Sequence, residues 1–321
     1  CGCVGQETTG AGGLGKAMRT VPVVLEIAQR ARELAKPDAW IIDFTNPVGI
    51  VTRALLDAGH RAIGLCNVAI NFQRQIAGHL GVPPERVLVD QVGLNHLTWI
   101  RAVWVDDRDV LDEVIARYGD AFAHEIGLPR SLIEQLGVIP SYYLRYFYAE
   151  REVVQEQRMT TPRARTVAEI ERRLLDLYRD PSLSEKPALL EQRGGAFYSE
   201  AATQLVASLA ADSGDVQVVD VRNAGAVAGL ADDDVVELPA RIGRDGAVPA
   251  PQPPLAPELL GLVQHVAAYE RLAASAAASG DREAARLALL AHPLVRDFRL
   301  VDGMLDRLLA GGTATRIGAG R

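Results

Sequence analysis

Apolar and polar segments alternate along the first hundred residues in a way that predicts helices and strands in turn. After a glycine-rich stretch, apolar residues at helical spacing over 21–28 indicate a helix. Apolar runs at 38–47 and 61–67 predict strands, each followed by an amphipathic helix, at 48–59 and 70–82. Two more strand-like segments occupy 86–96 and 99–107. This alternation is typical of a parallel α/β sheet.

From about residue 107 onward the pattern changes to longer and more charged helices. Helical periodicity is clear at 110–126, 166–180 and 196–212, and strands are predicted at 216–225 and 233–243. A proline-rich segment at 248–257 predicts a surface connector, and alanine-rich helices follow it. The second part of the chain is therefore expected to mix helices and strands without regular alternation.

Polar residues end several of the predicted strands. In parallel α/β sheets, ligands bind at the carboxyl ends of the strands, where Asn46, Cys66, Asn67 and His96 are expected. A thiolate and an imidazole together suit a divalent transition ion. Taken singly, Cys66 also fits a small buried apolar residue and His96 a hydrogen-bonded core residue. The spacing alone leaves both interpretations open.

The segment Gly10-x-Gly12-x-x-Gly15 has the spacing of a dinucleotide-binding glycine loop. That mechanism needs a strand before the loop and an acidic residue about 20 positions after it. Polar residues precede these glycines, and Asp43 lies 43 − 12 = 31 residues beyond Gly12. An ordinary glycine-rich turn therefore explains the motif better.

Two aromatic features are also candidates for function. Tyr198 follows a Gly-Gly turn at a predicted helix start, where it is either a packing residue or a base whose pKa is lowered by a neighbour such as Arg193. The segment 141–151 is dense in tyrosine and is interpreted as core or as a subunit contact.

Composition narrows the class of protein. The chain has 321 residues, 48% of them hydrophobic, and a net charge of −7. It can bury a large core, and nothing in it favours nucleic acid or a membrane as a partner. Three cysteines, Cys1, Cys3 and Cys66, make a disulfide framework unexpected and suit the cytoplasm. Because the chain starts with cysteine, we expect residues upstream of it.

Six short motifs occur in an order that resembles glycoside hydrolase family 4, the NAD-dependent glycosidases, and particularly its 6-phospho-β-glucosidases. They are GQETTGAGG, FTNP, GLCN, GLNH, RGGAFYS and HPLV, and the resemblance spans roughly residues 2–300. The resemblance implies hydrolysis of a β-glucoside 6-phosphate or phosphorylated disaccharide. The route is oxidation by NAD, elimination, addition of water and return of the hydride, with a divalent metal, usually manganese.

The resemblance also implies roles for individual residues. Cys66 and His96 match the metal ligands, and Tyr198 matches the base that removes a carbon-bound proton. Glu7 matches a carboxylate that accepts the hydrogen bond and proton of that tyrosine. The glycines from Gly10 to Gly15 then belong to a sugar-site segment rather than to a pyrophosphate loop.

Three further residues are assigned to the substrate by the same resemblance. Asn46 matches a substrate-binding amide. Asn67 stands where the α-glucosidase branch carries an aspartate acid, so the β branch is favoured. Arg222 is the candidate for the 6-phosphate, because a guanidinium binds phosphate through two hydrogen bonds.

The implied fold is an incomplete Rossmann-like parallel sheet followed by a lactate/malate-dehydrogenase-like α+β domain. We expect the remainder of the nucleotide-binding domain at 1–92, the substrate, metal and catalytic domain at 93–310, and a frayed tail at 311–321. The family's NAD-binding segment is not in this sequence, so we expect the chain alone to be impaired. A homodimer or homotetramer is expected. The alternatives are a non-catalytic sugar-phosphate binding module and a malate- or lactate-type dehydrogenase, against which Cys66 and His96 argue, because that class needs no metal.

Overall fold

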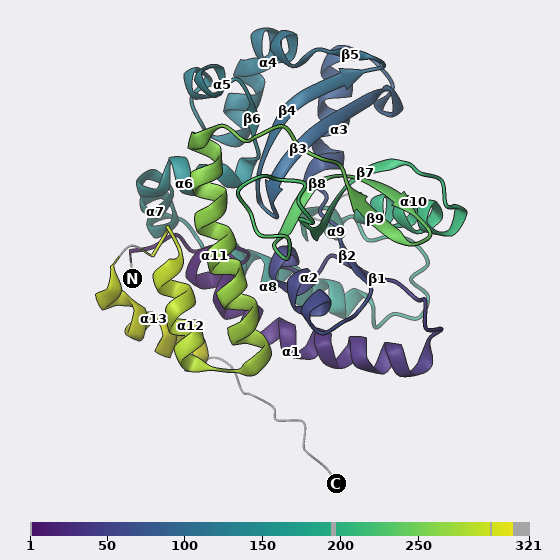
Figure 1. The fold of residues 1–321 in the computed structure, drawn as a ribbon. Helices are drawn as coiled ribbons and strands as arrows, with labels where there is room; N and C mark the ends of the chain where they lie inside the picture. Colours follow the sequence, from purple (N-terminus) through teal and green to yellow (C-terminus); the bar gives the residue numbers. More distant parts are fainter. Residues whose placement is uncertain (1, 194–196, 296, 311–321) are drawn as a thin grey trace.

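The computed structural model describes residues 2–193, 197–295 and 297–310. Within these residues the strands join into one mixed sheet in the order β1-β2-β7-β8-β3-β4-β5, with β6 paired to β4 and β9 to β8 (Figure 1). The strands are β1 (Ile41–Asp43), β2 (Ala62–Gly64), β3 (Val87–Leu94), β4 (Leu97–Val105), β5 (Arg108–Asp109), β6 (Ile139–Pro140), β7 (Val216–Arg222), β8 (Val235–Gly243) and β9 (Gly246–Pro249).

The helices surround this sheet and account for most of the remaining described chain. The longer ones are α1 (Gly10–Leu34), α2 (Val48–Asp57), α3 (Val68–Leu80), α4 (Leu111–Ile126), α7 (Glu150–Met159), α8 (Arg163–Leu177), α10 (Tyr198–Ala211), α11 (Pro257–Ser279), α12 (Arg282–Ala291) and α13 (Phe298–Ala310). Shorter ones are α5 (Arg130–Leu136), α6 (Arg145–Tyr148) and α9 (Leu189–Arg193), with 3₁₀ turns η1 (Pro84–Arg86) and η2 (Tyr142–Leu144).

The strand and helix alternation predicted for the first part of the chain is confirmed, and so is the α/β class. Strands β1 and β2 pair in parallel; α1 precedes them, α2 connects them and α3 follows β2. Strands β3 and β4 instead form an antiparallel hairpin, and β7 and β8 pair antiparallel as well. Parallel pairing is thus confined to the amino-terminal edge of the described sheet.

The carboxyl-terminal helices pack back onto the first helix. α11 contacts α1, α2 and α12, and α13 contacts both α1 and α12. These helices share one large apolar core, which includes Leu14 of α1, Val263 of α11 and Leu289 of α12. A second core lies between α3, α4 and the β3–β4 hairpin and includes Phe72 and Phe122.

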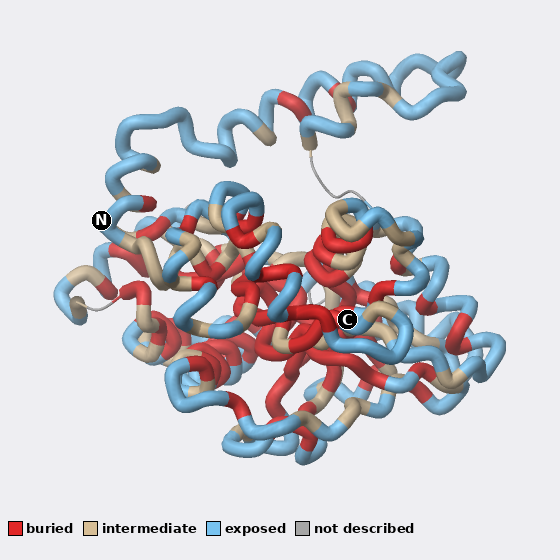
Figure 2. Tube along the Cα trace, turned by 90° about the horizontal axis from the view of Figure 1, so that it is seen from above, coloured by how far each residue is buried: buried red, intermediate tan, exposed pale blue. Residues whose placement is uncertain are grey.

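Helices α7, α8 and α9 form an arm that stands off the body and is mostly exposed (Figure 2). Only a few arm residues are buried, namely Val153, Ile170 and Leu174. Apolar residues on its surface include Met159 and Leu175. The predicted helix at 166–180 is therefore present, but it packs on its neighbour α9 rather than on the sheet.

Two parts of the predicted domain division can be compared with the structure. The limit between residues 92 and 93 falls inside β3, and the strands on both sides of it belong to the same sheet. Residues 311–321, predicted to be a frayed tail, lie outside the described residues.

Cys3 and Cys66 are both free thiols. Across the described ranges, we find no helix with the length and hydropathy to cross a membrane.

The glycines of the Gly10 to Gly15 motif lie in the first turns of α1, not in a loop after a strand. A Cβ atom on Gly12 would stand 2.0 Å from the backbone oxygen of Gln6, and one on Gly13 would stand 2.9 Å from that of Thr8. Glycine is needed because the segment before the helix folds directly against its first turns. The motif thus lets residues 6–9 fold against α1, and the glycine-rich turn expected from the sequence is instead the start of a helix.

Candidate active site

Asn46 and Cys66 follow the carboxyl ends of two neighbouring strands, β1 and β2, and so lie at the same end of the sheet. β1 and β2 are parallel and in register from Ile41 opposite Ala62 to Asp43 opposite Gly64. Their carboxyl ends therefore lie side by side, and the chain continues from each into a helix. Cys66 sits two residues beyond β2, just before α3, and is buried.

His96 reaches this edge from the β3–β4 hairpin. Leu94 pairs with Leu97, so Asn95 and His96 form a two-residue turn. The backbone of His96 is left-handed, with φ of 62°, a conformation that costs energy for a residue other than glycine. The turn aims the His96 side chain inward, where it is buried.

Asn95 connects the two candidate metal ligands. Its side chain hydrogen-bonds the Cys66 thiol and donates from Nδ2 to Glu237 Oε2 at 2.9 Å. Gln91 Nε2 donates to the other Glu237 oxygen. The structure therefore brings Cys66 and the turn that carries His96 together through one shared amide.

The imidazole of His96 is held on one face by an aromatic ring. The ring of Tyr143 stacks on it, with centroids 3.6 Å apart and planes 10° apart. Burial, and to a smaller extent the charge of Lys16, lowers the pKa of His96 to about 3. The imidazole is therefore neutral near neutral pH, which is the form that ligates metals. The tyrosine-rich segment, interpreted from the sequence as core or subunit contact, contributes directly to this site.

The Cys66 thiol stands in an acidic, buried environment. Burial raises its pKa well above the ordinary value, and Glu237 and Asp220 raise it further. Both carboxylate oxygens of Asp220 are buried without a hydrogen-bond partner. A cation at Cys66 would favour the thiolate and would offset the negative charge of these carboxyl groups.

The donor set fits a divalent metal with an open coordination sphere. Cys66 and His96 would supply one soft and one borderline ligand. In the part of the chain that the structure describes, no group of three or more histidine, cysteine or carboxylate side chains is arranged to hold a metal ion. An ion bound by these two residues would therefore take its remaining ligands from substrate or water.

Tyr198 is the first residue of α10 and lies near the same strand ends. Its ring stacks on Phe44, which follows β1, with centroids 5.4 Å apart. Burial raises the pKa of its hydroxyl, and negative charge at Cys66 raises it further. Arg193, considered from the sequence as a neighbour that lowers this pKa, instead pairs with Glu171 at 2.8 Å.

Glu7 lies on the segment before α1. Its carboxylate pairs with Lys16 Nζ at 2.8 Å, and its side chain is 59% exposed. Between described residues, no hydrogen bond joins Glu7 to Tyr198. The predicted contact between this carboxylate and the tyrosine is therefore not made in this structure, where Glu7 pairs with Lys16 instead.

The two candidate substrate amides differ in their surroundings. The side-chain oxygen of Asn46 is buried without a hydrogen-bond partner. A buried amide oxygen of this kind normally has a donor, and none of the described residues supplies one to Asn46. Asn67 directly follows Cys66 at the start of α3 and is half-buried.

Arg222 is not brought to this edge. β7 runs antiparallel to β2 with Asp220 opposite Gly64, so Arg222 lies toward the amino-terminal end of β2. Its guanidinium pairs with Asp57 at the end of α2 and donates to the backbone oxygen of Asp233. These contacts give Arg222 a structural explanation that does not involve a phosphate.

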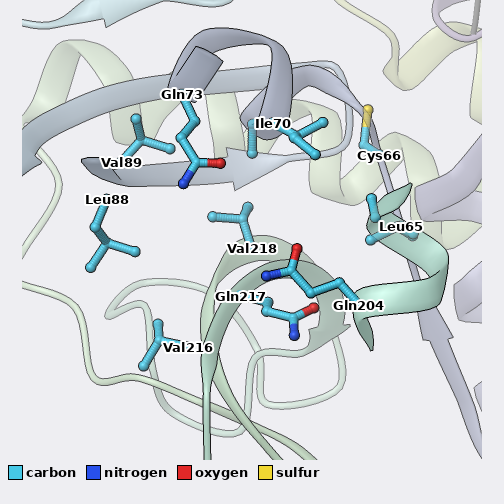
Figure 3. A pocket seen from close by; sticks show the side chains of 12 residues that line it. Leu65, Cys66, Ile70, Gln73, Leu88, Val89, Gln204, Val216, Gln217 and Val218 are labelled. Carbon is cyan, nitrogen blue, oxygen red and sulfur yellow. The ribbon is translucent and has the colours of Figure 1, made fainter. Parts of the chain in front are cut away.

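A small cavity adjoins Cys66 on the side of α3 and α10. Figure 3 shows Cys66 at one end, Gln73 on one wall, and Gln204 and Gln217 on the opposite wall. Its volume is about 90 Å³.

Five residues that contact the candidate ligands or raise their pKa were not among the sequence candidates: Thr8, which lies 2.6 Å from the His96 ring, and Asn95, Tyr143, Asp220 and Glu237. Asp220 and Glu237 could have been noticed, because each is an acidic residue within an otherwise apolar strand segment. Thr8 could not, beyond its place in the motif GQETTGAGG.

Comparison with known proteins identifies the class. Residues 91–295 match the model of the family 4 glycosyl hydrolase C-terminal domain. Residues 1–82 match the family 4 glycosyl hydrolase model. The chain therefore belongs to glycosyl hydrolase family 4, and the resemblance seen in the motifs is confirmed.

Individual relatives are similar over almost the whole chain. A protein of Bacillus subtilis (strain 168) named "Probable 6-phospho-beta-glucosidase" is 39% identical, over 96% of this chain and 72% of its own length. The 6-phospho-beta glucosidase of Thermotoga maritima, solved with NAD and glucose-6-phosphate, has a TM-score of 0.87 and 34% identity, over 96% of this chain and 74% of that one. A second structure of it, with manganese, NAD+ and glucose-6-phosphate, has a TM-score of 0.86 and 33% identity, over 97% and 74%.

Proposed function

We propose that this chain hydrolyses 6-phospho-β-glucosides with the help of NAD and a divalent metal, as its relatives' names and bound ligands suggest. The observation that carries the proposal is the approach of Cys66 and His96 through Asn95 at the strand ends that also hold Asn46 and Tyr198. Membership of a glycosidase family argues against the dehydrogenase alternative.

Each site residue receives a role in this proposal. Cys66 and His96 would hold a metal, for which Mn²⁺ is the candidate. When bound, such an ion supplies positive charge that stabilises an enediolate. Tyr198 would remove the proton from the sugar's second carbon, since its hydroxyl lies near Cys66 and is only partly buried. Glu7 would accept the proton of Tyr198 after leaving Lys16.

Asn46 and Asn67 are proposed to bind the sugar. The unpartnered oxygen of Asn46 would accept a hydrogen bond from a sugar hydroxyl. Asn67 follows Cys66 directly and has no acidic proton to donate to a leaving group. The β-linked substrate is therefore favoured over the α-linked one.

NAD supplies hydride transfer in this proposal, but we assign no residue to it. The glycines that match the dinucleotide motif are the first turns of α1, packed against residues 6–8. The backbone of Gln6 and Thr8 already occupies the space beside Gly12 and Gly13, and the Leu308 side chain occupies the space beside Gly15.

Because the chain alone is expected to be impaired, the proposal is tested with this chain joined to a family NAD-binding segment, using 4-nitrophenyl β-glucoside 6-phosphate, NAD and Mn²⁺ in heavy water. Removal and return of the proton at the second carbon should place deuterium there, and a substrate deuterated at this carbon should react more slowly. Tyr198→Phe keeps the ring against Phe44 but removes the hydroxyl, so the rate should fall on the order of 10²-fold or more.

Tyr178→Phe is the matched control, because Tyr178 is exposed at the end of α8 and stacks on no ring in the described structure. It should leave the rate unchanged. Product formed without deuterium at the second carbon, or normal turnover by Tyr198→Phe, would contradict the mechanism. Mn²⁺-dependent binding of glucose 6-phosphate without any turnover would favour the binding-module alternative.

The cellular setting is proposed on separate grounds. Free thiols at Cys3 and Cys66 suit a reducing cytoplasm. A homodimer or homotetramer is proposed as well, for which the exposed apolar residues of the α7–α9 arm are a candidate contact. Size-exclusion chromatography with light scattering tests the assembly.

A further inference from the structure

Thr8 is the only described residue that hydrogen-bonds the His96 ring. Its hydroxyl oxygen lies 2.6 Å from Nδ1 of His96, in a buried contact between residues 88 positions apart. A hydroxyl can donate to an imidazole nitrogen or accept from it. The direction of this bond decides which ring nitrogen carries the hydrogen, and therefore which nitrogen has the lone pair that a metal needs.

The side chain of Gln6 decides the direction. The backbone N–H groups of Thr8 and Thr9 both donate to its Oε1, the second at 3.1 Å. Because backbone N–H groups only donate, this atom is the amide oxygen and not the nitrogen.

The hydroxyl of Thr8 also lies 2.7 Å from this same oxygen. An amide oxygen only accepts, so the single hydrogen of the hydroxyl must point to Gln6. If that hydrogen pointed to His96 instead, two oxygen atoms would face each other at hydrogen-bond distance with no hydrogen between them. The hydroxyl therefore accepts from His96.

We infer that Thr8, oriented by Gln6, is a positioning residue that fixes His96 as the tautomer with hydrogen on Nδ1. The lone pair then lies on Nε2, and across the described part of the chain no residue hydrogen-bonds that nitrogen. Tyr143 stacked at 3.6 Å fixes the ring plane, so both the tautomer and the orientation are set before any ligand arrives.

The consequence for metal binding rests on the proposed function. A metal-ligating histidine normally donates its other ring N–H to a protein acceptor, and loss of that acceptor costs about 10–100-fold in metal affinity. Thr8 is this hydrogen-bond acceptor for His96. The tautomer itself does not depend on the proposed function, because it follows from hydrogen bonds within the chain.

The neighbouring residue provides a matched control. Thr9 has the same side chain, but its hydroxyl lies 3.0 Å from Nε2 of a different histidine, His292. Thr8→Val and Thr9→Val therefore remove the same group from adjacent positions, and only the first touches His96. Thr8→Ser keeps the hydroxyl.

The test is nitrogen NMR of the metal-free chain labelled with ¹⁵N in its histidine rings, with the His96 signals assigned by their loss in His96→Gln. The native chain, Thr8→Ser and Thr9→Val should show His96 with hydrogen on Nδ1, and Thr8→Val should lose this pattern. In Mn²⁺ titrations followed by electron paramagnetic resonance, Thr8→Val should bind about tenfold more weakly or worse, while Thr8→Ser and Thr9→Val stay close to the native chain.

Hydrogen on Nε2 of His96 in the native chain overturns the inference without any variant. Unchanged tautomer and unchanged Mn²⁺ affinity in Thr8→Val also overturn it, and so does an equal loss in Thr9→Val. If the native chain shows hydrogen on Nδ1 but binds no Mn²⁺, the tautomer stands and the metal site of the proposed function fails.

Discussion

Replacing Glu270 by glutamine should make the stability of the protein less sensitive to a rise in pH from about 4.5 to about 8. Glu270 lies on α11 and is 9% exposed. Its two carboxylate oxygens crowd Gly49 of α2, where an added Cβ would meet them at 3.1 and 3.2 Å. Burial raises the pKa of Glu270 to about 8, Arg53 lowers it, and Asp234 raises it again.

The sign and size of the effect follow from this pKa. An acid whose pKa is higher in the folded state than in the unfolded state favours folding while it is protonated, and this contribution is lost as the pH rises through the folded pKa. For Glu270 the loss runs from about pH 4.5 to about pH 8. Each tenfold change in proton affinity is about 1.4 kcal/mol, so the loss is at most about 5 kcal/mol.

Urea unfolding of the native chain and Glu270→Gln across this pH range measures the effect. Glutamine resembles protonated glutamate, so the two proteins should be within about 1 kcal/mol of each other at the acidic end. At the alkaline end the variant should be the more stable by several kcal/mol. Glu258→Gln makes the same change at an exposed position of α11 and should leave the pH dependence of the native chain intact. If the curves for Glu270→Gln and the native chain stay parallel, the buried carboxyl is not protonated in the folded state and the reasoning fails.

Three further predictions test the site and its support. Cys66→Ser and His96→Ala should each abolish Mn²⁺ binding in calorimetric titrations while the fold is largely kept, because both side chains lie at strand ends; unchanged affinity in either would remove the metal assignment. Gly12→Ala should destabilise the chain by about 1–3 kcal/mol in urea unfolding, because its Cβ would stand 2.0 Å from the Gln6 backbone oxygen. The control is Gly261→Ala, which has open space around it and should be neutral or stabilising. Arg222→Met should leave the affinity for glucose 6-phosphate unchanged, because the guanidinium pairs with Asp57, and a tenfold weaker affinity would restore Arg222 as a phosphate ligand.

Local pattern was sufficient to predict the elements of the first part of the chain. Short apolar runs ending in polar residues marked β1 and β2, and helical periodicity marked α1, α2 and α3. The same pattern did not distinguish parallel from antiparallel pairing for β3 and β4. The turn between them is Asn95–His96, with no glycine to mark a hairpin, and the left-handed backbone falls on His96, a residue type that rarely adopts it.

The contacts around the candidate ligands could not be predicted from the sequence pattern. Thr8 meets His96 across 88 positions, and Asn95 meets Glu237 across 142. No periodicity links such residues, because the fold brings them together only after the sheet is assembled. Motif order found the strand ends that carry Cys66 and His96, but it assigned Arg222 to a site that the strand register places it away from.

The raised pKa of Tyr198 does not argue against its role as a base. Burial is the main cause, and the others are negative groups, among them Cys66, Glu237 and Asp220. Two of these, Glu237 and Asp220, also raise the pKa of the Cys66 thiol, so one cluster of charge disfavours ionisation at both residues. A divalent cation held by Cys66 and His96 would act on both groups in the opposite direction. Formation of the thiolate and of the phenolate would then depend on the same ion, so a chain unable to bind metal at Cys66 should also lack the ionised tyrosine that would remove a proton near neutral pH.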